Sequence, residues 1–158
     1  MKKWLIIASV LVLAFGGFVA AAYFKAMQPK KEMAEAAFEK AKTVSDIKTL
    51  DDYYMYNGKD SYMIIIGLTD SGEKQVVWVP EKKNGKTVTE KYKSGKTEKE
   101  IKEIAEKKLN PEKIISIKLG MEENIPLWEV TYLDESKRYN YDYYDFKTGE
   151  WLKYYRSI

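Results

Sequence analysis

The chain of 158 residues contains no cysteine and no histidine. Without cysteine there are no disulfides, thiolate metal ligands, cysteine nucleophile or lipid-modified N-terminal cysteine. Without histidine there are no histidine-based catalytic triads and no imidazole metal ligands. The 27 basic and 24 acidic side chains leave a formal net charge of +3, which is too small to indicate nucleic-acid binding. Composition therefore favours a module that binds or positions another molecule, and we expect no cofactor, no metal and no nucleic-acid partner.

Hydrophobic residues are concentrated in one run, Trp4 to Phe24, with 21 residues and no charge. At about 1.5 Å per helical residue, this run matches one bilayer core of about 30 Å. Because it follows two lysines and has aromatic ends, we expect a short cytoplasmic tail and a transmembrane anchor over residues 1–29, with the body outside the cell membrane. A signal peptide cleaved after Ala20-Ala21-Ala22 is the alternative, since these residues have the small-x-small pattern of a cleavage site.

The rest of the chain predicts two units of similar order, residues 30–95 and 96–158. Corresponding features lie 64 to 66 residues apart, as for Tyr62 with Trp128 and for Gly85 with Gly149. The capping-box spacing of Thr97 and Glu100 indicates the start of the second helix. Apolar periodicity and turn residues predict helices over Lys31–Thr43 and Thr97–Leu109, and strands over Tyr62–Leu68, Gln75–Pro80, Thr87–Tyr92, Ile115–Met121, Leu127–Leu133, Arg138–Phe146 and Trp151–Arg156. A helix on one face of a small antiparallel sheet is the simplest arrangement for each unit.

The last predicted hairpin carries a resemblance to a known family. Residues 143–152 read YYDFKTGEWL, which resembles the closing strand pair of PepSY domains, where a polar turn ending in Thr-Gly joins two strands. The chain as a whole resembles the Bacillus-type YpmB/TseB proteins, described as cell wall elongation regulators, with a basic start, one apolar helix and two such units. The first unit departs from the pattern, because Asn84-Gly85-Lys86 takes the place of Thr-Gly-Glu.

This resemblance implies an α+β fold: an N-terminal transmembrane helix followed by two tandem cystatin-like, PepSY-like αβββ units. It also implies a membrane-anchored, extracytoplasmic regulator of cell-wall elongation that binds a penicillin-binding protein and has no catalytic residues of its own. Two alternatives stay open. One is a PepSY-type inhibitor or chaperone-like domain that acts on a secreted protease, and the other is a binder of glycan or another cell-wall ligand.

Aromatic residues are unusually dense near the C-terminus, with ten between Leu127 and Ile158. A small sheet with one helix cannot bury all of them, and Tyr and Trp are typical of binding surfaces. We therefore predict partner binding by exposed rings of Tyr139, Tyr141, Tyr143, Trp151 and Tyr155. The competing interpretation is that these rings pack across neighbouring strands and between the two units. A second acidic and aromatic cluster, Asp51 to Tyr56, is expected to be a solvated loop or a short edge strand.

Overall fold

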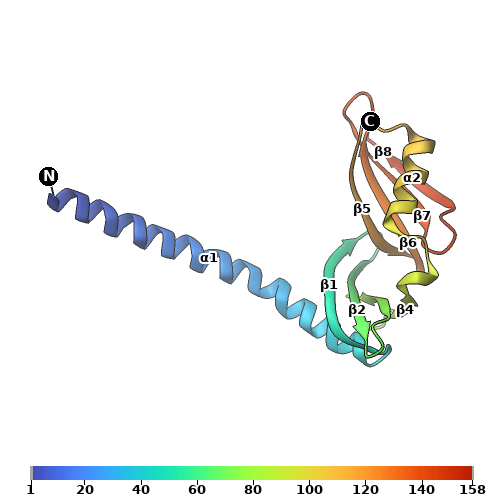
Figure 1. Cartoon of the computed structure of the whole chain (residues 1–158), viewed down its shortest axis with the longest axis horizontal. Helices are drawn as coiled ribbons and strands as arrows, with labels where there is room; N and C mark the ends of the chain where they lie inside the picture. Colours follow the sequence, from blue (N-terminus) through green and yellow to red (C-terminus); the bar gives the residue numbers. More distant parts are fainter. Residues whose placement is uncertain (1, 158) are drawn as a thin grey trace. The chain divides into compact units, whose positions relative to one another are not determined.

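The computed structural model describes residues 2–157, without the side chains at positions 2, 3, 5–10, 24 and 26–30. By its internal contacts the chain divides into two units, residues 1–36 and 37–158. The first helix, α1 (Lys2–Lys42), starts in the first unit and ends in the second. Its backbone is helical through position 29, where the sequence suggested a break between two helices. Figure 1 shows the elements in chain order.

The expected transmembrane helix is wrong. Among the residues that the structure describes, no helix combines the length and the apolar character needed to cross a membrane. The expectation also used the basic residues Lys2 and Lys3, whose side chains the structure does not describe. The rest of the fold class, an α+β arrangement of helices and antiparallel sheets, agrees with the structure.

Residues 37–158 contain two antiparallel sheets, each with four strands in simple sequential order. The description of each unit as αβββ is therefore also corrected to four strands, although the four strand ranges predicted within residues 96–158 overlap the strands of the second sheet. The first sheet consists of β1 (Ile47–Asn57), β2 (Ser61–Thr69), β3 (Lys74–Pro80) and β4 (Val88–Lys91). The second consists of β5 (Lys113–Glu122), β6 (Ile125–Leu133), β7 (Tyr139–Asp145) and β8 (Trp151–Arg156). A 3-10 turn η1 (Tyr92–Ser94) and the helix α2 (Glu98–Leu109) connect the sheets.

The additional strand is β1, which covers the acidic and aromatic cluster. It pairs with β2 along its length, from Ile47 opposite Thr69 to Asn57 opposite Ser61, with two irregularities in register. Because β1 lies at an edge, its middle residues, such as Asp51 and Asp52, are exposed. Register shifts and polar residues on an edge strand hide the two-residue alternation by which strands are recognised in a sequence.

The helix α2 begins where the capping box predicts. The Thr97 hydroxyl accepts a hydrogen bond from the Glu100 amide, and the Glu100 carboxylate accepts one from the Thr97 amide. The helix ends at Asn110, which adopts a left-handed conformation. Its apolar residues Ile101 and Ala105 are buried, and in Figure 1 it lies across one face of the second sheet.

One hydrophobic core is shared by the two sheets. It joins Ile64 and Trp78 of the first sheet with Trp128 and Tyr144 of the second and with Ile101 of α2. A smaller core covers the opposite face of the first sheet, where Ala37 and Ala41 at the end of α1 pack with residues of β2 and β3. The first sheet is therefore covered on both faces, which explains why β2 is apolar on both faces.

Candidate functional site

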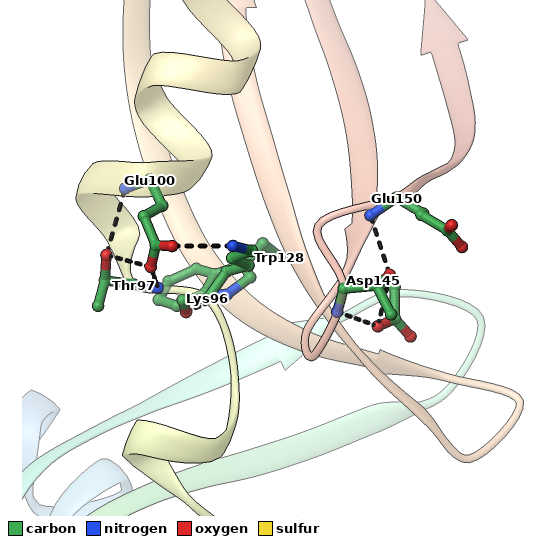
Figure 2. A network of polar contacts seen from close by, with 7 residues as sticks. Lys96, Thr97, Glu100, Trp128, Asp145 and Glu150 are labelled. Carbon is green, nitrogen blue, oxygen red and sulfur yellow. Dashed lines mark hydrogen bonds and ion pairs between the residues drawn. The ribbon is translucent and has the colours of Figure 1, made fainter.

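The Thr-Gly turn that carries the family resemblance has a structural role, because local hydrogen bonds fix its conformation. The Asp145 carboxylate accepts hydrogen bonds from the amides of Lys147 and Thr148, at 2.9 and 2.8 Å, and from the Thr148 hydroxyl at 3.1 Å. The Thr148 hydroxyl in turn accepts from the Glu150 amide. Figure 2 shows Asp145 and Glu150 of this turn together with Thr97 and Glu100 of the capping box. Gly149 has a φ of +72°, a conformation that glycine adopts without strain. The turn thus fixes the point at which β8 begins.

The same turn is attached to the start of α2. The Lys96 amide donates to the Phe146 carbonyl at 2.8 Å, and the Trp128 indole donates to the Lys96 carbonyl at 3.1 Å. A Cβ added to Gly95 would lie 2.4 Å from the Phe146 ring, so this position has room for glycine alone. These contacts attach the hairpin to the helix. Its second strand, β8, is the outer strand of the second sheet.

The predicted partner-binding residues do not form one surface. Tyr139, Trp151 and Tyr155 are exposed, with 52, 47 and 57 % of their surface accessible. Tyr141 is half-buried against the shared core. Tyr143 is only 5 % exposed, which differs from the exposed ring that we expected. Since opposed residues in the register share a face, Tyr155 lies with Tyr141 and Tyr143, whereas Trp151 pairs with Tyr144 on the other face. The binding role of these five residues stays a prediction.

Tyr143 is covered by polar neighbours and by Tyr155. Its ring meets that of Tyr155 edge to face at 5.9 Å, and the Lys153 ammonium lies 4.8 Å from its centroid. Burial raises the pKa of Tyr143, and the negative charge of Glu129 raises it further. Burial likewise raises the pKa of the Glu129 carboxyl, whereas a hydrogen bond from Tyr143 lowers it. Tyr143 therefore belongs to the packing between strands, as the competing interpretation proposed for such rings.

The opposite face of β8 is organised by a buried carboxylate, and the sequence analysis did not predict this burial. Asp142 is fully buried. One of its oxygens accepts from the Trp151 indole at 2.8 Å, and the other accepts from Arg156 at 2.5 Å. The Arg156 guanidinium lies 4.1 Å from the ring of Tyr154, which stacks on Trp151 at 5.8 Å. The only sequence signal of a ring on this face was the adjacent pair Tyr154 and Tyr155. Because neighbouring strand residues point to opposite faces, one of these two rings has to lie on it.

The exposed side chains of β8 lie on both faces of this one strand, and together we call them the β8 surface: Trp151, Leu152, Tyr154, Tyr155 and Arg156. Trp, Tyr and Arg are the residues most enriched at energetically important positions of protein interfaces. The β8 surface is thus the strongest candidate for binding in the part of the chain that the structure describes.

A cleft lies beside the β8 surface, between the two sheets, with a volume of about 550 Å³. Its lining includes Tyr143, Lys153 and Tyr155. The charged groups of the cleft are paired with one another: Lys59 contacts Glu123 at 2.9 Å, and Lys153 contacts Glu122. The Tyr56 hydroxyl also donates to Glu122, at 3.3 Å. These contacts join the tips of the first hairpin of each sheet, so the cleft is chiefly part of the junction between sheets.

The fold defines a class of protein: an α+β body of two four-stranded sheets that share one core. Comparison with known families assigns the two regions. The cell wall elongation regulator TseB-like domain matches residues 36–80, and the peptidase propeptide and YPEB domain matches residues 95–155.

Two relatives extend the likeness to most of the chain. The probable cell wall elongation regulator TseB of Bacillus subtilis strain 168 is 34 % identical over 148 residues, which cover 94 % of this chain and 92 % of the relative. The solved structure of the YpmB protein from Bacillus subtilis matches with a TM-score of 0.75 and 34 % identity, over 78 % of this chain and 96 % of that one. The chain therefore belongs to the family of TseB-like cell wall elongation regulators, as its resemblance indicated.

Proposed function

We propose that this protein regulates cell-wall elongation from outside the cell membrane by binding a penicillin-binding protein, without catalysis of its own. Membership in the family supports the role in elongation. The observation that carries the binding mode is the β8 surface, on which Trp151 and Arg156 are held in place by the buried Asp142. Exposed aromatic and apolar groups that are gathered in one place tend to mark interaction sites.

Chemical capture tests the partner. The full chain, tagged and crosslinked in the cells that make it, is purified, and the captured proteins are labelled with a fluorescent penicillin, which reacts with transpeptidases. We expect a labelled transpeptidase in the captured fraction, and we expect Tyr155→Ala to reduce its amount. Lys99→Ala, on the exposed outer side of α2, is the matched control and should capture normally. Recovery of glycan without any labelled protein would contradict the proposal.

The location has a separate test. Trypsin added to intact protoplasts should digest the body if it lies outside the membrane, since both sheets carry exposed lysines, such as Lys74 and Lys113. A cytoplasmic marker protein in the same cells should survive. Survival of the body alongside that marker would contradict the extracytoplasmic location.

A second function is favoured by the match of residues 95–155 to the peptidase propeptide and YPEB domain. It is inhibition, or assistance in folding, of a secreted protease. The same capture experiment separates the two functions, because a protease does not react with penicillin. A secreted protease as the main captured protein, with its activity lowered by the purified chain, would support this second function in place of the first.

A further inference from the structure

We infer that the partner binds by adding an extended, uncharged and apolar segment to the open edge of the second sheet, along β8. This inference rests on the proposed function, because it specifies how the β8 surface holds the partner. Strand addition of this kind combines main-chain hydrogen bonds, which supply affinity, with contacts to alternate side chains, which supply specificity.

The backbone of β8 has one side without a strand. Within residues 2–157, β8 ends the order of the second sheet and is hydrogen-bonded to β7 alone. Next to it, the Ser157 amide donates to the Tyr139 carbonyl at 3.3 Å, and Tyr155 lies opposite Tyr141. Because backbone groups alternate in direction along a strand, the amides and carbonyls of Tyr154 and Arg156 face the open side.

The side chains of β8 do not protect this edge. Edge strands are usually short, or carry charges and prolines that prevent pairing with another chain. Consistent with that rule, β4 has four residues and includes Glu90 and Lys91, and the exposed part of β1 contains two aspartates. In contrast, β8 has two basic residues that are paired within the protein, Lys153 and Arg156, and exposes four large hydrophobic side chains: Trp151, Leu152, Tyr154 and Tyr155.

The charges of β8 indicate an uncharged occupant. Its two basic residues already have acidic partners within the protein: Lys153 pairs with Glu122, and Arg156 pairs with Asp142. A charged strand laid beside them would have to compete with these internal pairs or leave its own charges without partners. A neutral, apolar segment would neither compete with these internal pairs nor carry charges without partners.

The surface is also arranged before binding. The two hydrogen bonds to the buried Asp142 fix Trp151 and Arg156, and Tyr154 lies stacked between them. Side chains that are already ordered lose less entropy when a partner binds. A segment of about six residues, or about 20 Å at the rise of a strand, spans β8. Its alternate side chains would contact Trp151 and Tyr154 on one face and Tyr155 on the other.

The test compares two substitutions at one position in the full chain. Tyr154→Pro removes the ring and the outward amide, whereas Tyr154→Ala removes the ring alone. Because the amide of Tyr154 faces away from β7, proline costs the sheet no internal hydrogen bond there. We expect Tyr154→Pro to reduce capture of the penicillin-labelled transpeptidase about tenfold below Tyr154→Ala, a factor that corresponds to the loss of a main-chain contact.

Equal capture by the two variants would overturn strand addition while leaving the proposed function intact. Failure of the unsubstituted chain to capture any labelled transpeptidase would instead contradict the proposed function. Thermal unfolding shows whether Tyr154→Pro folds. If it does not, hydrogen exchange of the unsubstituted chain replaces it: the amides of Tyr154 and Arg156 should gain protection when the purified transpeptidase is added, and unchanged exchange would overturn the inference.

A second copy of the chain is the other molecule that β8 could pair with. Sedimentation of the purified chain tests this occupant. We expect a monomer whose mass is unaffected by Tyr154→Pro. A dimer that this substitution dissociates would overturn the inference, because the edge would then be occupied by the protein itself.

Discussion

The two sheets have the same strand order, yet their surfaces differ. In the first sheet, both faces are covered, one by the shared core and the other by Ala37 and Ala41 of α1. In the second sheet, α2 and the first sheet cover the strands up to β7, but β8 is exposed at five of six positions. The same topology therefore gives two different surfaces: the first sheet is largely covered, and the second has an exposed edge strand, which is where we propose that the partner binds.

The largest expected effect breaks the core that the sheets share. The ring of Phe146 is buried, and its centroid lies 5.5 Å from the ring centroid of Trp78 in the first sheet and 6.5 Å from that of Trp128 in the second. Phe146→Ala should lower the free energy of unfolding by about 3–5 kcal/mol, as for other large-to-small core substitutions. Urea denaturation, followed by circular dichroism and tryptophan fluorescence, measures this loss. Phe146→Leu is the control and should cost less.

Both probes should report one transition in this experiment, since the sheets share one core. Two separate transitions in the unsubstituted chain would show that the sheets unfold independently, and the comparison would then concern two domains rather than two parts of one body.

The second-largest loss of stability is expected where the two sheets approach each other closely. A Cβ added to Gly120 of β5 would lie 2.5 Å from the ring of Tyr56 on β1. Gly120→Ala should therefore force the strands apart and cost about 1–3 kcal/mol of stability. In a double-mutant cycle with Tyr56→Leu, which makes room for the methyl group, the combined loss should be smaller than the sum of the two. Additive losses would contradict this contact.

The helix of the second sheet gives a pH-dependent prediction. Hydrogen bonds from the Thr97 amide, and then from Lys96 and the Thr97 hydroxyl, lower the pKa of Glu100 from 4.5 to about 2. A carboxyl whose pKa is lowered by folding adds stability above pH 4.5, and this stability is lost as the pH falls from 4.5 towards 2. Urea midpoints of Glu100→Gln should consequently decline less over this interval than those of the unsubstituted chain. Glu103→Gln, in the solvent-exposed middle of α2, should follow the unsubstituted chain, and an unchanged profile for Glu100→Gln would contradict the capping box as a source of acid sensitivity.

The smallest effect concerns the exposed rings. Tyr139 is 52 % exposed, so Tyr139→Ala should change the free energy of unfolding by no more than about 0.5 kcal/mol. Tyr144, on the same strand and fully buried, is the matched control, and its replacement by alanine should cost several times more. Thermal denaturation of the two variants suffices, and similar losses would show that Tyr139 has a structural role.

Local signals in the sequence predicted the local structure well. The helix α2 starts at the capping box of Thr97 and Glu100, and the last hairpin turns at Thr148 and Gly149, because hydrogen bonds between near neighbours decide both features. The strand β1 was anticipated only as one of two options, a loop or a short edge strand over Asp51 to Tyr56, since its exposed aspartates and register shifts hide the alternation. The apolar run from Trp4 to Phe24 predicted a membrane-spanning helix, which the described residues do not contain.

The sequence by itself determined how many aromatic rings the last strands carry and, by alternation, which rings of β7 share a face. On β8, a register shift places Trp151 on the face opposite Tyr155, which alternation does not predict. The sequence did not determine which rings are accessible. That was decided by tertiary structure: Tyr143 is covered by Lys153 and Tyr155, and Tyr144 is enclosed in the shared core. Tyr154 and Tyr155 remain exposed because β8 is an edge strand. Alternation is a property of one strand, whereas burial depends on what packs against each face, and only the assembled sheets supply that.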